Sequence, residues 1–249
     1  MPTNDFQKRI DDLAERCDRT QSVTATAFLT PAERYELRSY VSGRPELRLV
    51  LTGGQDGCER QRAFFLPDWL DGGDFDADEY IRAVRVEAFF GEPGHRDYMG
   101  AALGLGIRRE WLGDIRVHGS VAYIFCVPSV ISPLLDDLDK VGRCGVRTSP
   151  CALSDVPAPE RRVKKLSFTL KSPRLDAAAG AMFGLSRTAA AELIRMGAAT
   201  LNYAECAHVD AAVGEGDVIS LRCHGKGVVT AVGGRSRKDR LFVEAEILL

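Results

Sequence analysis

The 249-residue chain lacks any long apolar run, any strong excess of one charge and any closely paired cysteine motif. A membrane-spanning helix needs about 18 consecutive apolar residues, so the sequence predicts none. The first twenty residues, MPTNDFQKRIDDLAERCDRT, are too charged for a secretory signal. We therefore expect a cytoplasmic protein that has no membrane partner.

The cysteine spacing argues against two further classes of protein. The chain has seven cysteines, which is an odd number, and no two of them form a CxxC pair. Neither a disulfide framework nor a structural zinc site is therefore indicated. We expect reduced thiols, no metal and no cofactor. The composition, 45% hydrophobic and 27% charged, is typical of a globular protein with two or three small cores.

Charge is distributed unevenly along the chain. From Glu160 onward there are 14 lysines and arginines against 10 acidic residues, and the preceding residues hold 19 against 25. The net charge of −2 is therefore the sum of −6 for residues 1–159 and +4 for residues 160–249. This asymmetry favours contact between the C-terminal part and a polyanion, although drift can produce the same distribution.

We predict an α+β protein whose first domain, residues 1–75, is a small α/β unit. Residues 4–19 have the spacing of an amphipathic helix. The stretch Thr30-Pro31-Ala32-Glu33 supplies the cap, first-turn proline and capping glutamate of a second helix that runs to about Val41. LRLVLTGG and QRAFFLP read as two short strands around a turn.

Residues 76–148 show a β-α-β-β-α-β order of predicted elements. The successive segments are YIRAVRVEAFF, HRDYMGAALGL, GDIRVHG, SVAYIFCVP, PSVISPLLDDL and VGRCGVRT. This is the order of ferredoxin-like domains, which RNA-recognition domains share with many metabolic proteins. The aromatic motif of typical RNA-recognition domains is absent, since SVAYIFCV resembles it only loosely. Tyr123 and Phe125 could contact RNA, but packing within the sheet is the more frequent role.

A linker is predicted over residues 149–160, which contain three prolines and no periodicity, and a last domain over residues 161–249. This domain opens with a strand in which Leu166 and Phe168 alternate with polar residues. Four basic residues at its start either attract phosphate or protect a strand edge: Arg161, Arg162, Lys164 and Lys165.

Two short helices follow that strand in the prediction. Apolar residues recur at helical intervals within 175–183 and again within 190–194. Ser186 is a favourable N-cap for the second helix, and Gly197 is a favourable C-terminal stop.

The first turn of the second helix is a candidate phosphate site. It offers Arg187, Thr188 and free backbone amides at the positive end of the helix dipole. Arg195 lies two turns later, where Glu192 could neutralise it in a surface pair.

The stretch from Arg174 to Gly227 resembles the S4 (αL-type) RNA-binding domain. The matching motifs, in order, are Arg174-Leu175-Asp176, Leu185-Ser186-Arg187, Ile194-Arg195-Met196-Gly197, Leu201-Asn202, Gly216-Asp217 with VISLR, and a turn at His224-Gly225-Lys226-Gly227. In that family the two helices and the adjoining hairpin bind structured ribosomal or transfer RNA. The resemblance implies RNA contacts by Arg174, Ser186, Arg187, Thr188, Arg195 and Lys226. Tyr203-Ala204-Glu205 departs from the family's glycine-rich or basic turn.

The segment HRDYMGAALGLGIRREWLGDIRV resembles the hallmark of YlmH-type proteins, an HRD-x-LGALxGLGIxRExxGDI motif that precedes a C-terminal S4 domain. Domain order and length agree as well, so the resemblance covers nearly the whole chain. It implies a bacterial RNA-binding factor whose partners are rRNA, tRNA and the large ribosomal subunit. Family members are linked to ribosome quality control, in which peptidyl-tRNA from a stalled ribosome is held, and to cell division. We expect a monomer with no small-molecule substrate.

The hallmark residues also have simpler interpretations. Gly104-Leu105-Gly106 ends a helix and lacks a third glycine, so no nucleotide site is predicted. His95-Arg96-Asp97 fits the polar first turn of a helix better than an acid–base site. Arg108 and Arg109 follow on an exposed turn, where they either contact RNA or pair with Glu110 and Asp114.

Three classes of function remain open. The first is a non-catalytic RNA-binding adaptor of the ribosome, which we favour because no catalytic constellation is apparent. The second is an RNA-modifying enzyme of the pseudouridine synthase or methyltransferase type, since S4 modules also occur in those enzymes. The third is a cell-division-linked scaffold in which the acidic N-terminal part recruits a partner.

Overall fold

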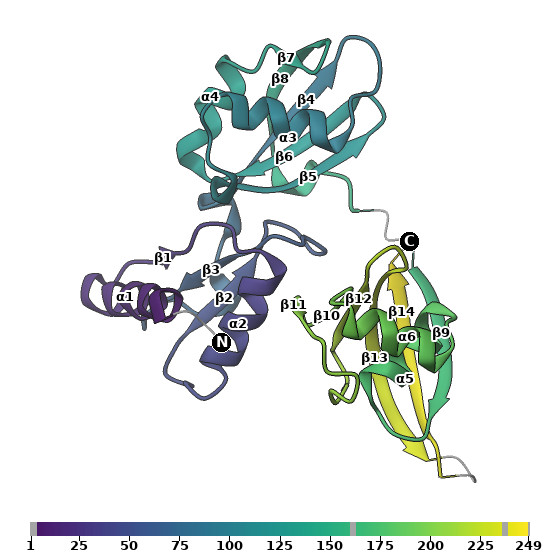
Figure 1. Cartoon of the computed structure of the whole chain (residues 1–249). Coiled ribbons are helices and arrows are strands. Elements are labelled where there is room, and N and C mark those ends of the chain that lie inside the picture. Colours follow the sequence, from purple (N-terminus) through teal and green to yellow (C-terminus); the bar gives the residue numbers. More distant parts are fainter. Residues whose placement is uncertain (1–3, 160–162, 236–238, 249) are drawn as a thin grey trace. The chain divides into compact units, whose positions relative to one another are not determined.

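The computed structural model describes residues 4–159, 163–235 and 239–248. The chain divides into two compact units, Met1–Pro159 and Glu160–Leu249, both drawn in Figure 1. Both units mix helices and strands, as predicted. Among the described residues, no helix is long and apolar enough to span a membrane.

The first half of unit 1 combines two helices with a small antiparallel sheet. The helices are α1 (Asn4–Thr20) and α2 (Pro31–Val41), and the sheet has the order β1-β3-β2, made of Thr24–Ala25, Arg62–Phe65 and Leu49–Thr52. Ile10, Leu37 and Phe65 bring both helices and the sheet into one core. The predicted capping box is confirmed, because Glu33 Oε2 accepts from the Thr30 amide at 2.7 Å and Thr30 Oγ1 accepts from the Glu33 amide at 3.2 Å.

The second half of unit 1 contains a five-stranded antiparallel sheet of order β5-β6-β4-β8-β7. Its elements are β4 (Arg82–Ala88), α3 (His95–Gly104), β5 (Leu112–His118), β6 (Val121–Cys126), α4 (Ile131–Asp136), β7 (Lys140–Val141) and β8 (Cys144–Cys151). Short 3₁₀ turns occupy Gly72–Asp74, Ala77–Glu79, Arg109–Trp111, Pro128–Val130 and Leu153–Asp155. The element order follows the prediction, except that the last predicted strand is a hairpin. The chain reverses there at Gly142, whose φ of +59° favours glycine.

One of the two hydrophobic cores of unit 1 crosses the predicted boundary at residue 75, whereas the other lies wholly in the first half. Phe28 and Phe64 of the first half belong to the same buried cluster as Val84 and Phe125 of the second. Gly113 makes this contact possible, since a Cβ atom there would lie 2.7 Å from Phe28 Cε1. The sequence pattern did not predict this contact between the two halves, because Phe28 lies outside the predicted helices and strands.

The predicted linker 149–160 is wrong in its first half. β8 extends to Cys151, and Leu153 and Val156 are buried in the core of unit 1. Gln55 Nε2 donates to the carbonyl oxygens of both Leu153 and Val156, at 2.9 Å for the second. The prolines suggested a linker, but Pro150 belongs to β8 and is in register with Val84 of β4. It lies beyond the residues of β8 that pair with β7, so the other edge of β8 is open there and proline is tolerated.

Unit 2 places two helices on one face of a six-stranded antiparallel sheet (Figure 1). The elements are β9 (Val163–Leu170), α5 (Leu175–Phe183), α6 (Arg187–Arg195), β10 (Ala199–Leu201), β11 (Ala204–Glu205), β12 (Val218–Leu221), β13 (Gly225–Arg235) and β14 (Leu241–Leu248). The strand order is β11-β10-β12-β13-β14-β9. Met182 of α5 packs against Gly227 of β13, where a Cβ atom would lie 2.4 Å from the Met182 sulfur.

One predicted turn in unit 2 is wrong. Lys226 and Gly227, expected in a turn, are the second and third residues of β13. The chain instead turns just before, at Cys223, whose φ is +66°, with the His224 amide donating to the Leu221 carbonyl oxygen at 2.9 Å. The glycines fit the strand because the helices approach it closely at Gly227.

Candidate nucleic-acid interface

The sharp connection between α5 and α6 creates the candidate interface. Gly184 follows α5 in the left-handed conformation, with φ +69°, which ends the helix. Ser186 then caps α6, and its Oγ accepts a hydrogen bond from the Ala189 amide at 3.1 Å, as predicted. Gly180 lets the two helices approach, since a Cβ atom there would lie 3.2 Å from the Leu185 carbonyl oxygen.

Asp176 joins the two arginine-bearing motifs of this helix pair. Its carboxylate accepts from Arg174 Nε and Nη2, each at 3.3 Å, and from Arg187 Nε at 3.0 Å. The Asp176 residue is only 4% exposed. Burial raises the pKa of Asp176, but hydrogen bonds from Arg174 and Arg187 outweigh that effect and hold this pKa below its usual value. The carboxylate is therefore ionised at neutral pH and fixes both guanidinium groups.

Arg187 remains open to a ligand although it is fixed at one side. Its side chain is 60% exposed, and only Nε is engaged by Asp176. None of the described residues accepts a hydrogen bond from its Nη atoms. Because Arg187 is also the first residue of α6, its free edge lies beside the positive end of that helix, a geometry that suits a phosphate oxygen.

Thr188 and Arg195 extend the same surface along α6. Both are exposed, and together with Glu192 they recur at the helical spacing of one stripe. No ion pair between Glu192 and Arg195 occurs in the part of the chain that the structure describes. The structure thus gathers five predicted residues on the helix pair, and we call this surface the helix face: Arg174, Ser186, Arg187, Thr188 and Arg195.

Lys226 lies apart from the helix face. Gly227 points toward α5, so the preceding residue projects from the opposite face of the sheet. Lys226 Nζ lies 5.1 Å from the centre of the Tyr203 ring, within cation–π distance.

The predicted hairpin motifs around Lys226 do meet in space. Asn202 and Tyr203 form the β10–β11 turn with φ values of +51° and +69°, the signs of a type I′ turn. Asn202 Nδ2 donates to Asp217 Oδ1 at 2.8 Å, and Asn202 Oδ1 accepts from the Val218 amide at 2.9 Å. The Leu-Asn and Gly-Asp motifs therefore hold the hairpin rather than face a ligand.

The two described residues of the basic start, Lys164 and Lys165, lie on a strand and not on the helix pair. Lys164 and Lys165 are exposed at the beginning of the edge strand β9. Lys165 Nζ lies 3.8 Å from Glu246 Oε1 of β14, a solvent-exposed pair of small energetic value. Arg161 and Arg162 lie outside the described residues.

Arg108 and Arg109 of unit 1 have different environments. The Arg108 side chain is 67% exposed, stacks 5.2 Å above the Trp111 ring and lies 3.6 Å from Glu110 Oε1. Arg109 turns inward and donates to the carbonyl oxygens of Leu112 at 2.7 Å and Gly113 at 3.3 Å. Burial lowers the pKa of Arg109 to about 10. Arg108 is therefore accessible to RNA, whereas Arg109 maintains the local backbone.

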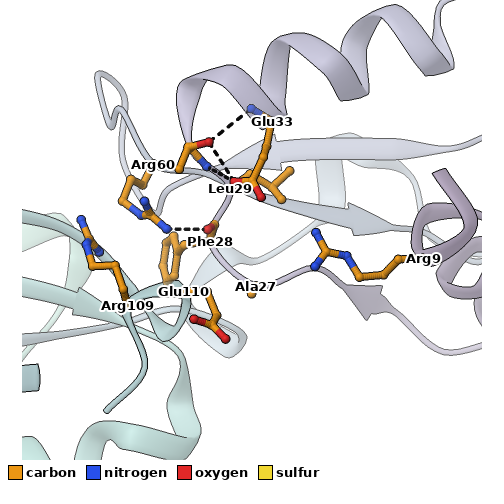
Figure 2. A pocket seen from close by; sticks show the side chains of 9 residues that line it. Arg9, Ala27, Phe28, Leu29, Glu33, Arg60, Arg109 and Glu110 are labelled. Carbon is orange, nitrogen blue, oxygen red and sulfur yellow. Dashed lines mark hydrogen bonds between the residues drawn. The ribbon is translucent and has the colours of Figure 1, made fainter. Parts of the chain in front are cut away.

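A cavity of about 220 Å³ lies beside Arg109 (Figure 2). Arg60 lines it as well and donates through Nη2 to the Phe28 carbonyl oxygen at 2.8 Å. The cavity is also lined by Arg9 and by two carboxylates, from Glu33 and Glu110. This mixture of charges does not select a ligand of one sign.

Comparison with known proteins identifies the part of the chain that carries the hallmark motif. Residues 75–155 match the family described as "Putative RNA-binding domain in YlmH". This part of the chain is therefore similar to the YlmH family. Over 221 residues the chain is 29% identical to the "Ribosome-associated protein quality control protein P2" of Bacillus subtilis (strain 168). The aligned region covers 89% of this chain and 86% of that protein.

A solved structure shares the fold. The "Cell division protein ylmH from Streptococcus pneumoniae" aligns with a TM-score of 0.52 and 20% identity, over 62% of this chain and 95% of that one. The resemblance to YlmH-type proteins that the sequence motif indicates is therefore confirmed.

Within residues 75–155, two acidic residues of the hallmark motif stabilise the fold. Asp97 Oδ2 accepts from the Gly94 amide at 2.8 Å and so caps α3, as its position in the first turn suggested. Asp114 accepts from the amides of Glu59 at 2.7 Å and Arg60 at 2.9 Å. The alternative that Arg108 or Arg109 pairs with Asp114 is not found, whereas Arg108 does approach Glu110.

Asp176 is the residue that sequence reasoning missed. It stands in the Arg174-Leu175-Asp176 motif but was not among the candidate site residues, because a carboxylate does not attract RNA. Its position among apolar residues of a predicted helix could have indicated that Asp176 is buried. A buried carboxylate requires charged or hydrogen-bonding partners.

Proposed function

We propose that the protein is a non-catalytic RNA-binding factor that binds structured ribosomal and transfer RNA on the large ribosomal subunit, in the cytoplasm, during rescue of stalled translation. The observation that carries this proposal is the exposed Arg187, held by Asp176 at the start of α6. A guanidinium group fixed before the ligand arrives loses little side-chain entropy on binding phosphate.

The fold supports this proposal in both units. In unit 2, two short helices on a sheet with a hairpin fit the S4 arrangement that the motifs indicate. In unit 1, the antiparallel order β5-β6-β4-β8 with α3 and α4 between strands fits a ferredoxin-like domain. The B. subtilis relative is named as a ribosome-associated quality control protein, which agrees with this function.

The proposal that the protein is not an enzyme has its own support. The acidic side chains of the hallmark motif, Asp97 and Asp114, accept hydrogen bonds from backbone amides of the fold. They are thus poorly placed to act as acids or bases on a substrate.

Ultraviolet crosslinking in the native cell, followed by sequencing of the attached RNA, tests the proposal. We expect reads concentrated on large-subunit ribosomal RNA and transfer RNA. Arg187→Glu should lose those reads, whereas Arg222→Glu should keep them because Arg222 is an exposed arginine at the end of β12, outside the helix face. Scattered reads, or reads that Arg187→Glu leaves unchanged, would overturn the assignment of this surface.

A further inference from the structure

The five-stranded sheet of unit 1 has one face that α3 and α4 do not cover. In β4, Val84 and Val86 are buried with Tyr98 of α3 and Leu134 of α4. Because side chains alternate along a strand, Arg85 and Glu87 project from the other face. Arg85 is paired in register with Tyr123 of β6 and Ser149 of β8, and Glu87 with Val121 and Arg147, so these residues share that face. Figure 1 shows α3 and α4 with these strands.

Among residues 4–159, the part of unit 1 outside this sheet covers one end of this face. Phe125 is wholly buried, and the Arg116 guanidinium lies 5.0 Å from the centre of its ring. Arg116 Nη1 is held by the Gln55 side chain and, at 2.9 Å, by the Pro157 carbonyl oxygen. The next residue of β6 on the same face is Tyr123, which is half-buried, so the cover ends between these two aromatic rings.

Two aromatic rings remain accessible on the uncovered part. Tyr123 lies with its ring centre 6.2 Å from that of His118, in an edge-on arrangement. Phe89, directly after β4, is 64% exposed. Its amide donates to the Gly145 carbonyl oxygen at 3.0 Å, and a Cβ atom at Gly145 would lie 3.0 Å from Phe89 Cδ2. The missing side chain of Gly145 therefore lets the Phe89 ring lie against the backbone of β8.

Arginines accompany both rings. Arg147 is exposed and lies 6.0 Å from the centre of the Phe89 ring. Arg85, in register with Tyr123, donates through Nη1 to Glu87 Oε2 at 2.8 Å, which compensates the negative charge of Glu87. The two guanidinium groups and one carboxylate give this surface a net positive charge. A net positive charge complements the negatively charged backbone of a nucleic acid.

We propose that the face formed by Arg85, Phe89, Tyr123 and Arg147, here called the sheet face, binds an unpaired RNA segment. Bases stack on the two rings, and the guanidinium groups contact phosphates. Flat π-surfaces flanked by arginine suit unstacked bases of any sequence, whereas a paired helix hides its bases from such rings. The inference rests on the proposed function in that the ligand is RNA. The family matched by residues 75–155 is described as a putative RNA-binding domain, and the inference adds which surface binds and that the RNA is unpaired.

The test uses the full chain and a fluorescently labelled, unstructured RNA of twelve nucleotides, with affinity measured by anisotropy. Phe89→Ala should weaken binding about tenfold, because stacking on one ring contributes on that order. Phe90→Ala is the matched control, since Phe90 is the neighbouring residue and is 60% exposed but lies at the alternate position. It should change the affinity less than about twofold. Equal affinities of Phe89→Ala and Phe90→Ala would overturn the proposal.

Tyr123 needs a conservative variant because its ring is partly buried. Tyr123→Phe keeps the stacking surface and should bind the single-stranded RNA within about twofold of the parent, whereas Tyr123→Ala should lose about tenfold. If Tyr123→Phe loses as much as Tyr123→Ala, stacking is excluded as the mode of binding. Loss of ribosome association by Phe89→Ala with unchanged RNA affinity would assign the face to a protein partner and overturn the inference.

A structured RNA measured in parallel separates this inference from the proposed function. Arg187→Glu should weaken binding of transfer RNA and spare the twelve-nucleotide RNA, and Phe89→Ala should do the reverse. If Arg187→Glu leaves both unchanged while Phe89→Ala still weakens the short RNA, the helix face fails and the sheet face stands.

Discussion

Arg187 of α6 donates a hydrogen bond from Nε to the buried Oδ2 of Asp176 in α5, across 3.0 Å. The same carboxylate also accepts from Arg174, which precedes α5. The RLD and LSR motifs are therefore parts of one arrangement, in which a buried anion orients two cations toward solvent. The proposed function thus assigns a positioning role to a residue that does not itself touch RNA.

Asp176→Asn should weaken RNA binding without a change in the number of arginines. The neutral amide no longer compensates Arg174 and Arg187, so neither guanidinium group stays in its present position. We expect the free energy of unfolding to fall by about 1.5 to 3 kcal/mol, the range for hydrogen bonds to charged groups. Chemical denaturation and RNA titration of the same preparation check the two effects. Full RNA affinity in a destabilised variant would contradict the positioning role.

The contribution of Asp176 should depend on pH in one direction. Its pKa in the folded chain lies below the reference value of 3.8, so its stabilisation is fully present above that pH. The stabilisation is lost as the pH falls through the folded-state value. The difference in unfolding free energy between the parent and Asp176→Asn should therefore shrink on acidification. A difference that grows in acid would show that the carboxylate is destabilising.

Arg109 and Arg108 should respond differently to removal of their side chains. Arg109→Ala removes the charged donor that bonds to the carbonyl oxygens of Leu112 and Gly113, which should cost about 1 to 2 kcal/mol of unfolding free energy. Arg108→Ala removes an exposed pair with Glu110 and should cost less than about 0.5 kcal/mol. Thermal or urea denaturation compares the two. The opposite order would refute the structural role of Arg109.

Gly113 should tolerate no side chain, although Gly100 of the same hallmark motif should. Gly113→Ala would place a methyl group 2.7 Å from Phe28 and 2.9 Å from Phe125, and such overpacking costs about 1 to 3 kcal/mol. Gly100 lies in α3 with no atom within 4 Å of a Cβ position, so Gly100→Ala should be neutral or stabilise by up to about 1 kcal/mol. Equal unfolding midpoints of the two variants would contradict this packing.

Local signals predicted much of this structure. The Thr30 and Ser186 caps and the helix-ending glycines lie where their side chains and φ preferences indicate, because such effects act within a few residues. The long β13–β14 hairpin was not predicted. It is held by pairing across the sheet and contains irregular register between Val229 and Arg235, and sequence periodicity alone does not show such pairing.

The candidate site was predicted less completely than the fold. Arg174, Arg187, Thr188 and Arg195 come together because two adjacent helices carry them. Lys226 was grouped with them, but the alternation of side chains along β13 directs it to the opposite face. The packing of Phe89 on Gly145 depends on two strands that are far apart in sequence, so only the structure reveals this second aromatic position.

The salt dependence of RNA binding by Arg187→Glu tests the central claim most directly. Each cation that contacts a phosphate steepens the plot of log affinity against log salt concentration by about one unit. We expect Arg187→Glu to bind structured RNA more weakly and with a slope about one unit flatter than the parent, and Arg222→Glu to keep the parent's slope. An unchanged slope and affinity for Arg187→Glu would show that the helix face does not contact RNA.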